Sequence, residues 1–477
     1  MVSRRGGVPV SLIFEQDQSK HFGATINLES PEPWWLDDLR LNHAKKMTLE
    51  AELGLRRPIH IVVATNRSAP FEDIANSLLQ SSAPTGVLSG KTPSGRPIVR
   101  WTYIAMDSTP TGALSKNMAK AIHQLSSAGV ESTLLNLPNS TELAEISSAR
   151  VAVLEYIRSM PHDDNPIIAW LDDDLSFDAL IPNDGAPMKN LAWSWLHEVW
   201  NFHEKNPDVA IGLGDVMGSP PLPASSTITS NLLDLQAFQN KQKVVNDSNR
   251  WTQFDYYYDI SETRDDFSPW PMIYEIERSS RSKFLHDILV NGVIARPLVI
   301  TQELLLNPRK NRYVRGGNTI VYNLKWLDAI DHPNIPRRGD TIWVLKAGKD
   351  GAKIRHFPVP LYHHREQIDA DWDVVSESCI ATWCKRIEDD LIGSSIQRWI
   401  RNGMDSDDEA FAILSSRAKL LQLSLKQGLE IAYTLDCSCK KEIIQALESG
   451  IIVTEEIINF PGKIDCLLND MREYMEA

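Results

Sequence analysis

The sequence predicts an α/β protein with a mostly parallel central sheet flanked by helices. Short apolar runs alternate with segments of helical spacing between residues 58 and 215, as expected for parallel strands joined by crossover helices. One of these runs, Ile167–Leu171, is apolar throughout and fits a strand buried on both faces. From Ser376 onward the apolar residues recur at helical intervals, which predicts an α-helical C-terminal region.

These patterns divide the chain into three expected parts. Residues 1–57 form an N-terminal extension, residues 58–375 form the α/β domain, and residues 376–477 form the helical region. A chain of 477 residues has ample length for more than one domain.

Within the α/β domain, we assign each strand to an apolar run and each helix to a segment of helical period. Predicted strands are Ile59–Asn66, Val99–Asp107, Glu131–Leu137, Ile167–Leu171, Val209–Asp215, Asn318–Tyr322, Trp343–Lys346 and Phe357–Tyr362. Predicted helices are Phe71–Gln80, Leu114–Gly129, Leu143–Met160 and Leu191–Lys205. The Pro- and Ser-rich segment Gly218–Thr229 is predicted to be a mobile loop.

The composition excludes some classes of protein. A formal net charge of −14 argues against a general nucleic-acid coat or a binder of anionic membranes. No run of about 18 apolar residues is present, so we expect no membrane span, and we see no signal peptide. Five cysteines without a framework of pairs favour reduced thiols, and hence a cytoplasmic location.

Three consecutive carboxylates, Asp172, Asp173 and Asp174, follow the apolar run Ile167–Leu171 directly. Like charges repel one another, and burying them is costly unless a cation is present. A hard divalent ion, Mg²⁺ or Mn²⁺, would satisfy these oxygens and could still hold a diphosphate. The alternative is a solvated acidic loop after a core strand.

A strand ending Val63-Ala-Thr-Asn66 is followed along the chain by Ala149-Arg150 on a helix, the Asp triplet, Gly316-Gly317, Gly339-Asp340 and His363-His364. The order of these motifs along residues 58–365 resembles the GT-A glycosyltransferases, and most closely their family 2-like group that uses nucleotide-diphosphate sugars. The resemblance implies a GT-A fold, which is Rossmann-like. Residues 58–215 would form its nucleotide-sugar half, and residues 216–375 its acceptor half.

The resemblance also implies a metal site. In the family, the last acid of a D-x-D motif contacts Mn²⁺ or Mg²⁺, which makes Asp174 the expected direct ligand. Asp172 would reach the ribose or the sugar or join the metal ligands, and Asp173 would take either role. A late histidine is often another ligand, so His363 or His364 fits, and an imidazole suits Mn²⁺ better than Mg²⁺.

Other residues match positions that bind the nucleotide in the family. Thr65 and Asn66 follow the first strand, where the family holds base and ribose. Asp107 ends the second strand and would face a uracil, which favours a UDP-sugar. Arg150 would lie near the nucleotide. Helix capping for the polar residues and a surface salt bridge for Arg150 are the alternatives.

Two later motifs match positions near the reacting sugar. In the family, a Gly-rich turn such as Gly316-Gly317 faces the donor sugar and the acceptor, and Arg315 could stabilise phosphate charge. A solvated basic loop is the alternative. Asp340 matches the general base, which would deprotonate the acceptor hydroxyl and give inversion. Gly339 replaces the acid that usually precedes this base, and a helix cap is the alternative reading.

The chain is therefore expected to be a metal-dependent glycosyltransferase. The competing enzyme class is a nucleotidyltransferase, although Thr65-Asn-Arg-Ser-Ala lacks the glycines of that class. A prenyl-type acidic helix fits poorly, and the non-enzyme alternative is a sugar-nucleotide-binding protein. The acceptor is open among a glycan, a metabolite, a peptide and a modified nucleic acid. The C-terminal helices could cap the catalytic domain or form a homo-oligomer contact.

Overall fold

The computed structural model describes most of the chain from residue 56 onward. The described residues are 56–65, 71–82, 87–106, 113–137, 145–161, 164–181, 188–191, 195–219, 221–240, 256–257, 285, 287–292, 296, 298, 317–365 and 376–477. The expected N-terminal extension lies almost entirely outside these residues. So do four expected site residues: Asn66, Asp107, Arg315 and Gly316.

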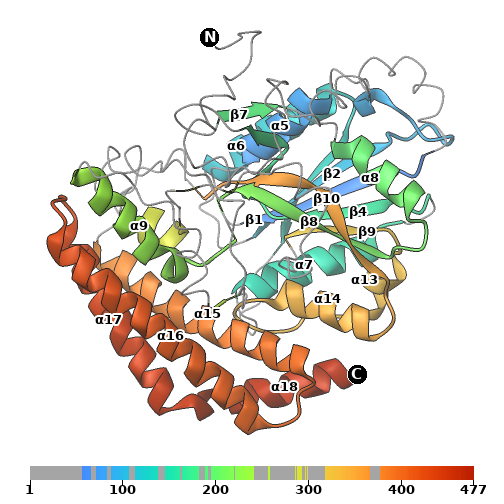
Figure 1. Ribbon diagram of the computed structural model, residues 1–477. Helices are drawn as coiled ribbons and strands as arrows, with labels where there is room; N and C mark the ends of the chain where they lie inside the picture. The colour runs from blue at the N-terminus through green and yellow to red at the C-terminus, as the bar shows by residue number, and fades with distance from the viewer. Residues whose placement is uncertain are drawn as a thin grey trace, which may run out of the picture.

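An eight-stranded sheet lies at the centre of the described chain, in the order β3-β2-β1-β4-β9-β8-β10-β5 (Figure 1). The strands are β1 (Ile59–Thr65), β2 (Val99–Met106), β3 (Glu131–Leu137), β4 (Ile167–Leu171), β5 (Leu175–Ser176), β8 (Ile211–Gly218), β9 (Asn318–Val321) and β10 (Ile354–His363). β1 is parallel to both β2 and β4, and β8 is parallel to β10. β9 runs antiparallel between β4 and β8, and β5 runs antiparallel to β10. The mostly parallel sheet is confirmed.

A small hairpin of β6 (Asp178–Ile181) and β7 (Met188–Leu191) forms a second, antiparallel sheet. It follows β5 directly. Residues 188–191 are therefore a strand, and the helix predicted to begin at Leu191 begins only at Trp195.

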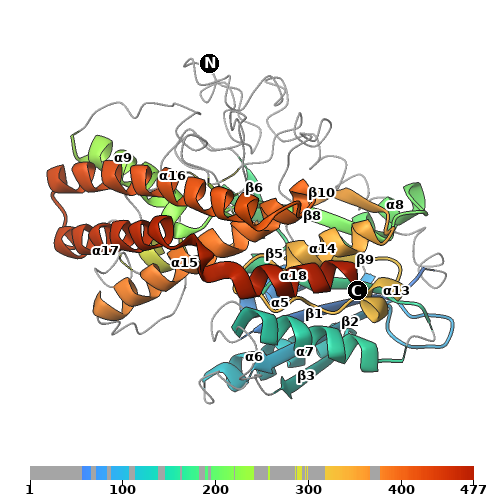
Figure 2. The same ribbon diagram turned by 90° about the horizontal axis from the view of Figure 1, so that it is seen from below.

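Helices cover both faces of the central sheet (Figures 1 and 2). Alternate residues of β4 point to opposite faces: Ile167, Ala169 and Leu171 belong to one apolar core, and Ile168 and Trp170 to another. The first core is completed by α5 (Phe71–Ser82), α6 (Ala113–Ser127) and α8 (Trp195–Lys205). The second is completed by α7 (Glu145–Ser159), α13 (Lys325–Ala329) and α14 (Gly339–Lys349). This is a three-layer arrangement.

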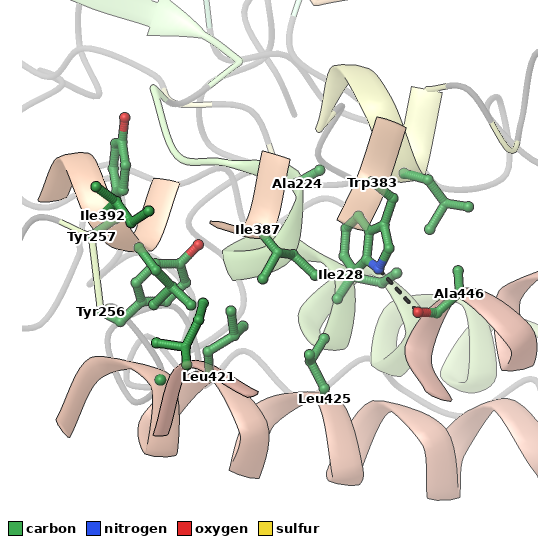
Figure 3. Close-up of a cluster of buried hydrophobic side chains, with 14 of the residues drawn as sticks. Ala224, Ile228, Tyr256, Tyr257, Trp383, Ile387, Ile392, Leu421, Leu425 and Ala446 are labelled. Atoms are coloured by element: carbon green, nitrogen blue, oxygen red, sulfur yellow. Dashed lines mark hydrogen bonds between the residues drawn. The ribbon is translucent and has the colours of Figure 1, made fainter. Parts of the chain in front are cut away.

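The C-terminal region is helical, as predicted, and it shares its core with the middle of the chain. Its helices are α15 (Ser376–Asn402), α16 (Asp407–Thr434), α17 (Lys440–Asn459) and α18 (Asp465–Glu476). They pack with α9 (Ala224–Gln239), and Ile228 of α9 lies among Trp383, Leu421 and Leu425 (Figure 3). Three short helical turns complete the description: η4 (Val87–Ser89), η6 (Asp287–Asn291) and η7 (Pro461–Ile464). None of the helices that the structure describes is both long and apolar enough to span a membrane.

Two sequence predictions are wrong in this part of the chain. The segment predicted as a mobile loop contains the start of α9, whose small polar residues are buried and hydrogen-bonded: Thr229 donates to the Ser424 carbonyl at 2.8 Å. Residues 343–346, predicted as a strand, belong to α14. That helix is apolar on two sides, because Ile342 packs into the helical core while Trp343 and Val344 pack under the sheet.

Candidate functional site

The sheet has a point at which its strand order reverses. β2 and β3 lie on one side of β1, whereas β4 lies on the other side. In open α/β sheets, ligands bind outside the carboxyl ends of the strands at such a reversal. Thr65 ends β1 and Asp172 follows β4, so the acidic triplet lies at the place where topology predicts a ligand.

Asp173 fastens the ends of these two strands together. The Thr65 hydroxyl donates to Asp173 Oδ2 at 2.5 Å, and both residues are buried. The segment Asp173–Asp174 forms a turn rather than an extended strand. Strand alternation therefore does not determine where the three carboxylates point, and each of them has its own partner.

Asp172 is held by a cation and by a glycine. Arg150 of α7 donates to Asp172 Oδ1, and the Asp172 N–H donates to the Gly317 carbonyl at 2.8 Å. A Cβ at Gly317 would overlap the Asp172 carboxylate. Glycine at this position therefore permits the close approach of β9 to the end of β4.

The pKa of Arg150 is affected by the carboxylates of both Asp172 and Asp340. Burial would lower the Arg150 pKa, but the carboxylates of Asp172 and Asp340 together raise it above the ordinary value. The guanidinium also lies 5.5 Å from the ring centroid of Trp170 in a cation–π arrangement. Asp340 lies in the first turn of α14, and its Oδ1 accepts a hydrogen bond from the Thr341 N–H at 2.8 Å.

Asp174 faces His363, the last residue of β10. His363 Nε2 lies 3.2 Å from Asp174 Oδ2, and His363 Nδ1 lies 2.7 Å from the Ser219 carbonyl oxygen. A carbonyl only accepts hydrogen bonds, so Nδ1 must carry the proton. In a neutral imidazole, the Nε2 lone pair then points toward a carboxylate oxygen, an arrangement that a shared cation would stabilise.

His364 takes a different direction from its neighbour. Its backbone N–H donates to the Asp174 carbonyl at 2.6 Å, but its Nε2 lies 2.8 Å from the Ser176 hydroxyl. Ser176 in turn donates to Asp178 at 2.7 Å. Of the two histidines, the geometry therefore favours His363 as a partner of Asp174.

The spacing of Asp174 and His363 fits a divalent ion. Neighbouring ligands of an octahedral ion with bonds of about 2.1 Å lie roughly 3.0 Å apart. The Oδ2–Nε2 separation is 3.2 Å. Among the residues that the structure describes, no group of three His, Cys, Asp or Glu side chains could hold a metal ion. Two protein ligands would leave several coordination positions for substrate oxygens and water.

Two features of this site had no clear signal in the sequence. The Ser219 carbonyl that orients His363 is a backbone group, which any residue would supply. His332 packs near Trp170, with ring centroids 6.2 Å apart. Burial, with a smaller effect of the Arg150 charge, lowers its pKa to about 3, so it is a neutral imidazole behind the acidic turn.

Comparisons with known proteins show a likeness to solved structures only. The chain matches no protein-family model and no curated protein. Among solved structures, it is similar to the mannosyltransferase PcManGT from Pyrobaculum calidifontis in complex with GDP-Man and Mn²⁺, at 11% identity and a TM-score of 0.35. The likeness covers 90% of this chain and 99% of that chain. At this level, fold and function have to be argued from the residues of the chain itself.

Proposed function

We propose that the protein is a metal-dependent glycosyltransferase of the GT-A type, which transfers a sugar from a nucleotide-diphosphate sugar to a hydroxyl group. A UDP-sugar is the favoured donor. The proposal is supported by the acidic turn at the reversal point of the sheet, with His363 on the same edge. Residues 58–215 would hold the donor, and residues 216–375 the acceptor.

One observation carries the proposal: Asp174 Oδ2 and His363 Nε2 face each other across 3.2 Å, while His363 Nδ1–H donates to the Ser219 carbonyl. This pair has the ligand types and spacing that Mn²⁺ accepts. When bound, Mn²⁺ or Mg²⁺ would supply Lewis-acid neutralisation of the leaving diphosphate. Asp172 would then contact the ribose or the sugar, in an orientation fixed by Arg150.

Asp340 is the proposed general base. Its carboxylate is one of the charges that raise the Arg150 pKa, and Arg150 also donates to Asp172 of the acidic turn. Its Oδ1 is oriented by the Thr341 N–H. A carboxylate within hydrogen-bond reach of the acceptor hydroxyl would take its proton as the hydroxyl attacks the anomeric carbon, and attack from the side opposite the diphosphate inverts that centre.

A thermal-shift screen of nucleotide sugars with and without Mn²⁺ tests the donor site. A cognate donor at about 100 times its Kd should stabilise the native protein by about 2.7 kcal/mol, which raises Tm by a few degrees. Asp174→Asn should remove the Mn²⁺-dependent part of this shift. The exposed Asp408 supplies a matched control, Asp408→Asn, which should behave like the unchanged protein.

Mn²⁺-dependent hydrolysis of the donor tests the chemistry, and it is measured by the release of the nucleotide. We expect Asp174→Asn to lower it by more than about 100-fold, since outer-shell partners of a metal already contribute 10–100-fold. Binding of the donor without hydrolysis or transfer would favour a sugar-nucleotide-binding protein. Absence of Mn²⁺-dependent binding to every nucleotide sugar tested would overturn the proposal.

A further inference from the structure

A cavity lined by arginines lies next to the candidate metal site. It occupies about 40 Å³ where α15, the start of α9, η6 and the end of β10 meet. A single buried water needs about 10–15 Å³ on the same measure, so the cavity has room for several waters or for one phosphate group. Arg337, Arg365 and Arg386 line it together with the carboxylate of Asp390.

Backbone carbonyls position two of the three guanidinium groups. Arg365 donates to the Asn291 carbonyl at 2.8 Å, and Arg386 donates to the neighbouring Val290 carbonyl. Both carbonyls belong to η6, so one short turn fixes both arginines. A hydrogen bond to a carbonyl leaves the positive charge of a guanidinium unchanged.

The charges of the cavity favour an anion. Asp390 is buried, and the Arg337 Nε lies 3.3 Å from its Oδ1. Burial raises the pKa of Asp390, and Arg337, Arg386, Arg365 and Arg338 act in the opposite direction. Among the described residues of the lining, three arginines therefore accompany one aspartate. Guanidinium forks match the oxygens of a phosphate in geometry as well as in charge.

The first turn of α9 adds to this positive character. Ala224 and Ser225 line the cavity, and this helix of 16 residues has no side-chain cap at its start. A Cβ at Gly292 would lie 2.9 Å from the Ala224 nitrogen and 3.1 Å from Arg365 Nη1, so the Arg365 guanidinium lies beside the helix start. The free N–H groups of a first helical turn favour negative charge.

The cavity is connected to the candidate metal site at two places. Arg365 follows His363 by two residues, and Pro221 of the lining follows Ser219 by two residues. Two residues of chain span at most about 7 Å. A molecule anchored in the cavity could therefore extend a hydroxyl group toward the edge that carries Asp174 and His363.

We propose that this arginine cavity binds the phosphate group of the acceptor, and that the acceptor is a phosphate monoester. That the bound molecule is an acceptor rests on the proposed glycosyltransferase function. Phosphate binding by the cavity can be measured independently of that function. Guanidinium groups from three different segments would enclose the phosphate oxygens, and the sugar-accepting hydroxyl would lie on the part of the molecule nearest His363.

Titration of the full chain with inorganic phosphate, in EDTA and at constant ionic strength, tests the cavity. EDTA removes metal ions from the acidic turn. Without a metal ion, the carboxylates of the turn repel phosphate, so the titration reports on the cavity. We expect Arg365→Gln and Arg386→Gln each to weaken phosphate binding about tenfold or more, since each removes a charge-assisted contact. Arg401→Gln, an exposed arginine on the same helix as Arg386, is the matched control and should bind like the unchanged protein.

Further variants keep the test decisive if the glutamine variants fold poorly. Arg386→Lys retains a positive charge and should retain most of the phosphate affinity. Asp174→Asn should bind phosphate normally while losing Mn²⁺-dependent donor binding, so failure of the donor site and failure of the cavity give different results. Equal phosphate affinity in Arg365→Gln, Arg386→Gln and the unchanged protein would overturn the inference. So would loss of donor binding, rather than phosphate binding, in these two variants.

Two phosphate monoesters distinguish the source of the phosphate. Glycerol 3-phosphate and 1-hexanoyl-glycerol 3-phosphate, used below its micelle concentration, share a glycerol phosphate with a free hydroxyl group and differ in one acyl chain. Equal binding of the two indicates a soluble acceptor, and tighter binding of the second indicates a lipid phosphate. Binding of neither, with no competition against inorganic phosphate, contradicts the inference.

Discussion

At the scale of single residues, His332 links the candidate site to the pH dependence of stability. Its pKa of about 3 in the folded chain compares with about 6.5 in an unfolded one. Between about pH 6.5 and pH 3, the His332 side chain is therefore protonated in the unfolded chain and neutral in the folded chain. The neutral His332 therefore does not lower the free energy of unfolding above pH 6.5. As the pH decreases from 6.5 toward 3, the free energy of unfolding falls.

We predict that His332→Asn flattens this dependence. The unchanged protein should lose about 2 kcal/mol of unfolding free energy through His332 between pH 7.5 and pH 5. Urea unfolding at the two pH values gives the difference, which cancels any constant packing cost of the substitution. His123→Asn, at an exposed position on α6, controls for a general effect. An unchanged pH slope in His332→Asn would show that the prediction is wrong.

Gly317 makes a second residue-scale prediction. Gly317→Ala should displace the Asp172 carboxylate, because the added Cβ would occupy its place, and so separate it from Arg150. We expect donor binding to weaken at least tenfold, with an overpacking cost of about 1–3 kcal/mol in stability. In the control Gly462→Ala, the nearest atom to the added Cβ would lie 3.6 Å away. Normal donor binding by Gly317→Ala would contradict this account of the acidic turn.

At the scale of elements, α9 is anchored by a buried ion pair. Arg296 donates to both oxygens of Asp234, with each distance 2.9 Å, and the two side chains are 2% and 0% exposed. Asp234→Asn would leave a buried guanidinium without its counter-charge, which typically costs about 3–5 kcal/mol.

The matched comparison for this pair is Asp331→Asn. Asp331 pairs with Arg158 at 2.7 Å but is 81% exposed, so its loss should cost less than about 1 kcal/mol. Urea denaturation of both variants measures the two costs. If Asp234→Asn proves no more destabilising than Asp331→Asn, the anchoring role of the buried pair is refuted.

The elements also show how far the sequence could be interpreted. The apolar runs of β1 and β4 predicted their strands, since a strand buried on both faces needs little else to be recognised. α9 and α14 could not be recognised, because each is buried on more than one side and its helical period is obscured. Their burial depends on tertiary packing that no local pattern encodes.

The same distinction applies to the candidate site. The Asp triplet and the His pair stood out as residues, and their order placed them on one sheet edge. The choice of His363 over His364 required the positions of Ser219 and Ser176. Arg386 of the arginine cavity comes from a helix outside the motifs, so only the folded chain brings it to Arg365.

At the scale of the whole molecule, α14 joins the two halves of the hydrophobic interior. Ile342 packs into the helical core, whereas Trp343 and Ala347 pack under the sheet. α18 returns to the same layer, since Lys349 of α14 donates to the Met475 carbonyl at 2.8 Å. The helical region and the sheet are therefore expected to unfold together.

Ile342→Ala tests this coupling. Removing a buried isoleucine side chain typically costs about 2–5 kcal/mol. We expect one calorimetric transition in the unchanged protein and in the variant, with the whole transition moved to lower temperature. Two separate transitions, of which only one moves in the variant, would show that the two cores are independent.

The backbone carbonyl of Ser219 orients His363, and this affects which substitutions each of the two positions can tolerate. A scan of all substitutions should tolerate many residues at position 219, since each still offers the same oxygen, while position 363 should tolerate almost none. Variation of the side chain at position 219 would then say little about the importance of its carbonyl oxygen. Position 219 would be essential in its backbone and nearly neutral in its identity.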